Sequence, residues 1–174
     1  PQLGILLPLI YRATVKDLDL IRKVDLGPFK YEKDFGLDLR KASFDCMRTM
    51  IAGTLSPLIP LTPFLERVVQ GLEDVPDVRA ISQLILGTVA GLPAAPAAML
   101  LMLDKIVAAL STTLNERLKD NAVRQEKERH DDSLKGALRA VQLLAAVPDI
   151  VQSPIFASFM EKTVRCSMFC FNKE

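Results

Sequence analysis

The sequence contains few of the residues from which catalytic and metal sites are usually built. Its 174 residues include no tryptophan, one histidine (His130) and three cysteines. An odd number of unevenly spaced cysteines excludes a self-contained disulfide scaffold and is typical of a reducing compartment. Zinc sites and nucleophilic sites each gather several His, Cys or acidic side chains around one point, and a single His rarely suffices. We therefore expect no catalytic residue, no metal ligand and no bound cofactor.

The chain also lacks an excess of charge of either sign. Lys and Arg number 22 against 21 Asp and Glu, so the net charge is +1. No overall positive field is present to hold phosphates, which argues against a nucleic-acid partner. Residues 80–103 carry no charge, but Gly87, Gly91, Pro93 and Pro96 interrupt them, and a membrane span needs about 20 continuous apolar residues. We expect two short buried helices joined by a proline-bounded turn, and no membrane partner.

Apolar residues recur every three or four positions along nearly the whole chain, which is typical of amphipathic helices. The string Asp-Leu-Arg-Lys-Ala at residues 38–42 returns in altered form at residues 77–81, after 39 positions (77 − 38), and again at 133–137. The first interval matches a HEAT repeat of roughly 40 residues. In each string the first residue should cap a helix, the Leu or Val should pack inward, and the Arg or Lys should stay at the rim.

These features predict an all-α fold, a HEAT-repeat α-α superhelix with one inserted β-hairpin. We expect three helix pairs followed by a terminal helix after Ser153, with the pairs at residues 1–53, 54–93 and 94–147. A mixed-sign charged surface favours a monomer. The expected apolar face of the first helix contains Leu3, Leu6, Leu7 and Ile10.

The cysteines are expected to be structural. Leu39, Ala42, Cys46 and Met50 are spaced to share the core face of one helix, so Cys46 should be buried and inert. Cys166 and Cys170 lie four residues apart among apolar side chains. Packing on a terminal helix explains that pair better than zinc binding, which would need two more ligands.

Two segments do not fit the repeat. Between residues 21 and 37, apolar and charged residues alternate on both sides of Gly27-Pro28, which predicts a β-hairpin at about residues 22–36. Because Gly-Pro is not a standard two-residue hairpin loop, the turn could instead lie near Lys33-Asp34. Residues 112–132 are dense in charges of both signs and predict an exposed insertion that runs into a solvated helix.

Several strings resemble a known family in their residues and their order. They include Lys-Val-Asp-Leu-Gly-Pro-Phe-Lys at residues 23–30 and Gly-Leu-Asp-Leu-Arg-Lys-Ala-Ser-Phe-Asp-Cys-Met at 36–47. Further matches lie at residues 119–126, 139–141, 147–149 and 153–154. Together they cover about residues 3 to 160 and resemble the C-terminal end of the cullin-associated, neddylation-dissociated proteins, also called TATA-binding-protein-interacting proteins.

The resemblance implies that residues 1–174 form the single C-terminal HEAT-repeat domain of a longer solenoid that wraps around an unmodified cullin–RING scaffold. It implies a non-catalytic exchange factor in the cytoplasm and nucleus, whose hairpin lies against the cullin N-terminal region and competes with an adaptor or substrate-receptor module. The TATA-binding protein is a further implied partner. The implied contact residues are Val24, Asp25, Leu26, Gly27, Pro28, Phe29, Lys30, Tyr31 and Lys33.

Two other interpretations stay open at this stage. The hairpin could be a structural plug between helices, because exposed loops carry function only as a tendency. The chain could also be a generic HEAT-repeat scaffold or transport adaptor that binds another helical partner.

Overall fold

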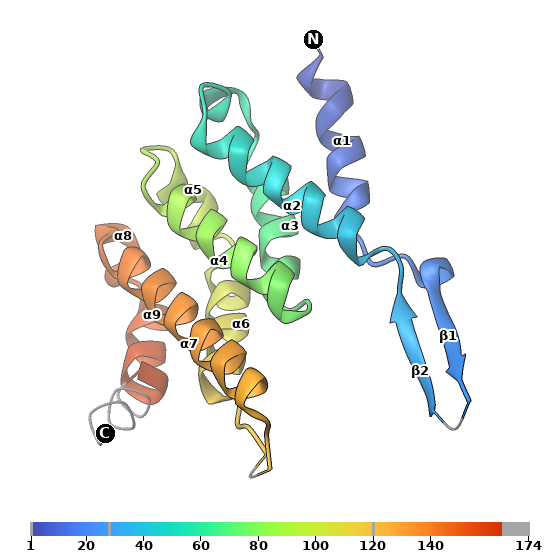
Figure 1. Cartoon of the computed structure of the whole chain (residues 1–174). Helices are drawn as coiled ribbons and strands as arrows, with labels where there is room; N and C mark the ends of the chain where they lie inside the picture. Colours follow the sequence, from blue (N-terminus) through green and yellow to red (C-terminus); the bar gives the residue numbers. More distant parts are fainter. Residues whose placement is uncertain (1, 28, 120, 165–174) are drawn as a thin grey trace.

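The computed structural model describes residues 2–27, 29–119 and 121–164. Its helices stack side by side, from α1 at the right of Figure 1 to α8 and α9 at the left. A two-stranded hairpin projects from the first helix pair. The main elements are α1 (Leu3–Ala13), β1 (Ile21–Leu26), β2 (Phe29–Asp34), α2 (Leu37–Ala52), α3 (Leu61–Leu72), α4 (Pro76–Ala90), α5 (Ala95–Leu100), α6 (Leu103–Asn115), α7 (Arg124–Ala145), α8 (Pro148–Val151) and α9 (Pro154–Phe159). Short 3-10 turns at Leu18–Leu20 and Ser56–Leu58 and a π-helical turn at Met160–Val164 complete the described elements.

The helices are arranged in pairs and in two layers. Helices α2, α4 and α7 lie side by side in one layer, and α3, α6 and α9 lie behind them (Figure 1). The pairs α1–α2, α3–α4 and α6–α7 follow one another, and each packs on the next. This arrangement confirms the predicted all-α, HEAT-like fold with one inserted hairpin.

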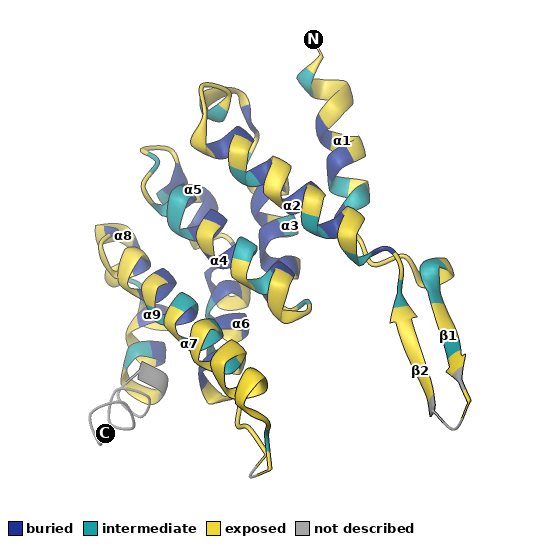
Figure 2. Ribbon diagram, in the orientation of Figure 1, coloured by how far each residue is buried: buried dark blue, intermediate teal, exposed yellow. Residues whose placement is uncertain are grey.

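The core lies between the two layers, as the buried positions in Figure 2 show. Its largest apolar members include Phe44, Phe64, Leu65, Ile85, Leu86, Met99 and Leu103, each at most 1% exposed. Burial of each such side chain contributes about 1.5–3 kcal/mol. The uncharged stretch from residue 80 to 103 contributes part of this core from α4 and α5, but Leu84, Leu100 and Leu101 are 52%, 40% and 76% exposed, and α4 has 15 residues rather than being short. No helix in the described ranges is long and apolar enough to cross a membrane.

Glycines allow the stacked helices to approach closely. A Cβ added to Gly71 of α3 would overlap the Ser82 hydroxyl of α4 and lie 2.7 Å from the Phe44 ring of α2. A Cβ on Gly136 of α7 would likewise overlap the side-chain oxygen of Gln83. Since the neighbours at these sites are buried side chains, the contacts between α2, α3, α4 and α7 leave no room for even a methyl group.

The buried face of α2 differs from the predicted one. Leu39 is 56% exposed and Cys46 is also exposed, whereas Phe44, Met47 and Ile51 are at most 1% exposed. Met50 is 7% exposed, as predicted, but the rest of the predicted face is wrong by about one residue, which rotates a helix by roughly 100°. The physical reason is Arg40: it was predicted to lie at the rim, but its side chain is 1% exposed and occupies the buried face.

The expected starts of three helices and the expected start of the charged insertion also differ. Ser133 was predicted to open a helix, but it lies inside α7, which already begins at Arg124. Asp38 and Asp77 lie in the first turns of α2 and α4 rather than at the N-cap. Helix α6 extends to Asn115 and buries Thr113 and Leu114, so its last turn overlaps the start of the expected charged insertion at 112–132.

The first helix has apolar residues on two sides. Leu7 and Ile10 are buried against the stack, as expected, but Leu6 is 48% exposed and does not share their face. Ile5 and Leu9 are 72% and 59% exposed beside it. The expectations for Cys166 and Cys170 fall outside the described residues.

Candidate functional site: the projecting hairpin

The hairpin has a two-residue turn at the position that the sequence suggested first. Strands β1 and β2 pair antiparallel from Ile21–Asp34 at the base to Leu26–Phe29 at the tip. Gly27 has a φ of 73°, which a glycine adopts without strain and which tight hairpin turns require. The alternative turn near Lys33-Asp34 is wrong, because both residues pair with β1.

The two faces of the hairpin differ in chemistry. Side chains alternate along a strand, so Val24 and Tyr31 share one face, and Asp25 and Lys30 share the other. Tyr31 is 46% exposed, and Val24 opposite it is partly buried. On the other face Lys30 Nζ lies 3.5 Å from Asp25 in an exposed ion pair, which contributes under about 1 kcal/mol. One face is therefore partly apolar towards the tip, with Arg22 and Lys33 nearer the base, while the other carries the Asp25–Lys30 and Lys23–Glu32 pairs.

The structure brings most of the predicted contact residues together on the projecting ribbon, which lies away from the helical layers (Figure 1). Lys33 lies over the ring of Phe35, 5.0 Å from its centroid. Phe35 is 53% exposed. It was not among the predicted contact residues, because it comes after the last residue of the alternating pattern. For Leu26 and Phe29 the structure describes the backbone pairing, and Pro28 lies outside the described residues.

A buried arginine attaches the hairpin to the helices. Arg40 Nη1 donates to Asp34 at the end of β2 over 2.7 Å. The same guanidinium donates from Nε and Nη2 to both oxygens of Asp74, at 2.9 and 3.1 Å. Asp74 lies in the loop between α3 and α4, so Arg40 joins the hairpin base to the second helix pair. Bidentate pairs of this kind are directional as well as strong.

The remaining hydrogen bonds at the base restrict the same residues further. Asp34 Oδ1 accepts from the backbone N–H of Gly36 over 2.9 Å. Asp74 Oδ1 accepts from the N–H of Val75 over 2.7 Å. Gly36 is buried, and a Cβ there would lie 3.1 Å from Leu20. The chain therefore leaves the hairpin through a close-packed, hydrogen-bonded corner.

The ionisation of this network follows from its contacts. Burial raises the pKa of the Asp34 carboxyl, but the hydrogen bonds from Arg40 and Gly36 outweigh it, so that pKa lies below its usual value. Burial lowers the pKa of Arg40, yet the hydrogen bonds to Asp74 and Asp34 raise it above its usual value. Both groups are charged at neutral pH, which is the condition for the ion pair to hold the base.

We also searched the described residues for side chains that could together bind a metal ion. No group of three or more His, Cys, Asp or Glu side chains converges within residues 2–27, 29–119 and 121–164. The described feature that sets this chain apart from a plain helical stack is thus the hairpin and its arginine anchor.

Comparison with known proteins agrees with this architecture. The family described as TATA-binding protein interacting (TIP20) matches residues 1–164. The chain belongs to this family. It is 40% identical over 158 residues to cullin-associated NEDD8-dissociated protein 1 of Arabidopsis thaliana, covering 89% of this chain and 13% of that protein.

Two further relatives have similar names. The chain is 38% identical over 154 residues to cullin-associated NEDD8-dissociated protein 2 of Rattus norvegicus, covering 88% of this chain and 12% of that protein. It is 33% identical over 145 residues to a protein of Emericella nidulans named as the C-terminal part of cullin-associated NEDD8-dissociated protein 1, covering 83% of this chain and 14% of that protein. The chain thus spans about an eighth of the length of these relatives.

Proposed function

We propose that this chain is a non-catalytic protein-binding module of a cullin-associated factor, and that its hairpin competes with an adaptor or substrate-receptor module on the cullin. The observation that carries this proposal is a ribbon that projects from the stack while a buried Arg40 fixes its base. An isolated two-stranded ribbon cannot bury both of its faces, so its apolar face is available to a partner. The names of the relatives point to a cullin as that partner.

Tyr31 is the described side chain best suited to the contact. Aromatic residues are frequent among the positions that dominate interface energies, and Tyr31 is 46% exposed on the partly apolar face. Lys33 is exposed on the same face as Tyr31 and Lys30 on the opposite face, and both should affect the association rate more than the affinity. The proposal includes a cytoplasmic and nuclear location and, from the family name, the TATA-binding protein as a second partner.

The experiment shortens the hairpin and leaves its anchor intact. Replacing residues 24–31 by Asn-Gly retains the three pairs nearest the base, from Ile21–Asp34 to Lys23–Glu32, and retains the ion pair of Asp34 with Arg40. Asn-Gly suits a two-residue turn. The variant is tested in a chimeric protein, in which this chain replaces the matching segment of a full-length relative. We expect it to bind unmodified cullin as before and to lose displacement of the adaptor.

A point variant and a matched control refine the test. Tyr31→Ser should weaken adaptor displacement, whereas Lys23→Gln with Glu32→Gln alters only the charged face and should have little effect. Loss of cullin binding together with displacement, or retention of both by the shortened hairpin, would assign the hairpin a purely structural role and favour a generic HEAT-repeat scaffold.

A further inference from the structure

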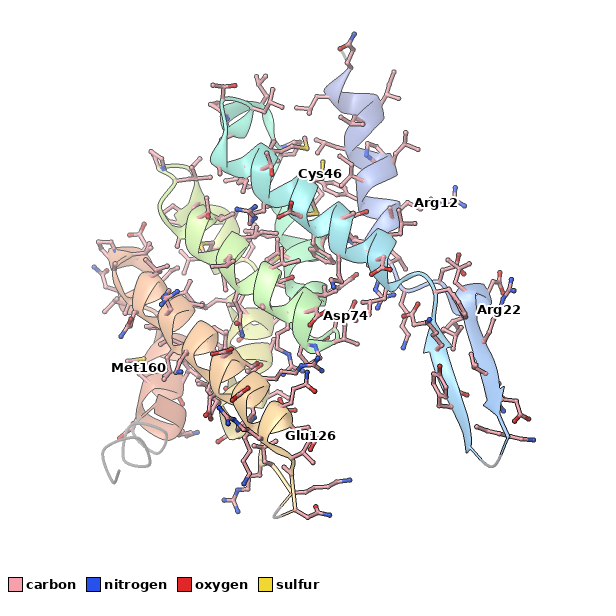
Figure 3. All side chains as sticks on the ribbon, viewed as in Figure 1. Arg12, Arg22, Cys46, Asp74, Glu126 and Met160 are labelled. Atoms are coloured by element: carbon pink, nitrogen blue, oxygen red, sulfur yellow. The ribbon has the colours of Figure 1, made fainter. Side chains whose placement is uncertain are left out.

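A second surface with distinct chemistry lies at the edge of the stack from which the hairpin projects. It is a pocket of about 380 Å³ between the start of α4, the chain after α6 and the first turns of α7. Figure 3 labels Asp74 and Glu126 along this edge, with Arg22 on the hairpin beyond it. The basic members of its lining are Arg79, Arg117, Lys119, Arg129 and His130.

Positive charge dominates the described lining. Of its two acids, Glu116 accepts from Arg79 Nη1 over 2.7 Å, and Glu126 accepts from the backbone N–H of Val123 over 3.2 Å. Within the described part of the chain, no ion pair joins Arg117, Lys119 or Arg129 to an acid. A concave site lined by one sign of charge raises the local concentration of the opposite charge.

Buried donors in the wall lack partners. The side chain of Arg79 is 15% exposed, and its Nε makes no hydrogen bond among the described residues. The hydroxyl of Ser133 is buried and equally without a partner there. An unpaired buried donor costs free energy, and a bound ligand that supplies an acceptor would recover it.

The pocket is continuous with the hairpin anchor. Arg79 Nη2 donates to the backbone oxygen of Asp74 over 3.4 Å, and Asp74 carries the bidentate bond from Arg40. A partner lying along this edge would therefore meet the pocket and the hairpin base together.

We propose that this pocket binds an acidic, partly apolar segment of a protein partner through its carboxylates. The apolar part follows from Pro76 and Leu118 in the lining and from Val75 and Val123 beside it, which are 37% and 61% exposed. Glu116 and Glu126 favour singly charged carboxylates over a dianionic phosphate, since like charges at close range repel. The apolar lining and the two glutamates both favour a peptide over a small anion as the ligand.

The test measures fluorescence polarisation of a labelled peptide in which Asp and Glu alternate with Leu, added to the full 174-residue chain. A variant with Arg117→Gln, Lys119→Gln and Arg129→Gln removes three exposed charges from the pocket. Its matched control, Arg12→Gln, Lys105→Gln and Lys162→Gln, removes three exposed charges outside the lining and gives the same net charge. We expect saturable binding that weakens about tenfold in the pocket variant and changes little in the control.

A third variant should change binding in the opposite direction. Glu126→Gln removes a negative charge while retaining an oxygen that can accept from the Val123 N–H, so the peptide should bind more tightly. If both triple variants weakened peptide binding equally, the net charge of the chain would explain the effect, and the proposal would be overturned. Full displacement of the peptide by equimolar inorganic phosphate would also overturn it, in favour of a small-anion site. The shortened hairpin should leave peptide binding unchanged, so the two proposals fail separately.

Discussion

Replacing Arg40 by Met tests whether the hairpin is held by a buried ion network. Methionine keeps an unbranched side chain of similar reach and suits the apolar surroundings, so packing is largely retained. The guanidinium, however, makes three charge-assisted hydrogen bonds, one to Asp34 and two to Asp74. The substitution therefore removes the one positive charge, with a small change in volume, and leaves the two carboxylates without their partner.

The magnitude follows from the exposure of the partners. Removing one member of a buried ion pair costs about 3–5 kcal/mol, because an uncompensated charge stays in the interior. Here the two carboxylates are 19% and 16% exposed, so water recovers part of that loss. We expect the free energy of unfolding to fall by about 2–3 kcal/mol, and the melting temperature by about 5–10 °C for a chain of this size.

The pH dependence gives an independent readout. Asp34 has a folded pKa below its unfolded value, so its contribution is complete above about pH 4 and is lost as the pH falls through the lower, folded pKa. The raised pKa of Arg40 adds stability that is complete below its unfolded pKa and is lost only in strong alkali. The wild-type chain should therefore lose stability below about pH 4 more steeply than Arg40→Met.

Urea unfolding of the two chains between acid and neutral pH makes the comparison, with Asp34→Asn as the second arm of a double-mutant cycle. Because Arg40 and Asp34 act as a unit, the double variant should lose less than the sum of the single losses. Strict additivity, or a wild-type stability at neutral pH for Arg40→Met, would refute the role of this network.

Two further predictions concern the helical stack. Gly71→Ala should lower stability by about 1–3 kcal/mol in thermal unfolding, because the methyl group would overlap Ser82 and crowd Phe44; Gly4→Ala in α1, with no atom within 4 Å, should be neutral or stabilising. Amide hydrogen exchange should be slow at Thr113 and Leu114 in the last turn of α6 and fast from Arg117 to Lys119, after the N–H of Glu116 closes the helix; uniform protection across both would contradict the boundary at Asn115.

The fold was predictable because the sequence features that determine it act between residues close together in the chain. Helical periodicity, prolines between helices and a glycine at the turn each act over a few residues, and they gave the helix pairs and the hairpin correctly. Helix α7 shows the limit of this approach. Its first turns carry charges and no apolar stripe, and the sequence predicted an exposed insertion that runs into a solvated helix. Residues 124–129 are indeed helical and exposed, but their helix is continuous to Ala145 and includes Ser133, where a separate helix was expected to begin.

The ion pairs of Arg40 with Asp34 and Asp74 were not predictable, because they depend in part on residues far apart in the sequence. Arg40 lies between Leu39 and Lys41 and was assigned to the rim, since an arginine is rarely buried without a partner. Its partners are Asp34 and Asp74, and the second lies 34 positions away in the loop after α3. Assigning Arg40 to the surface rotated the predicted core face of α2 and placed Cys46 inside. The signal that could have found it is an acid at the end of the second strand and another in the loop between α3 and α4.

The anchor also explains how a thin ribbon can present a contact in a defined place. Each strand has six residues, so at about 3.3 Å per residue the tip lies about 20 Å from the base. A tilt of about 10° at the base would move the tip by about 3 Å, which exceeds the tolerance of a close-packed interface. Hydrogen bonds from Arg40 to Asp34 at the end of β2 and to Asp74 in the loop between α3 and α4 resist this tilt, whereas a single contact would leave the hairpin free to rotate about it. The burial of a charged arginine, unfavourable for stability by itself, is thus consistent with a requirement to fix the direction of the hairpin.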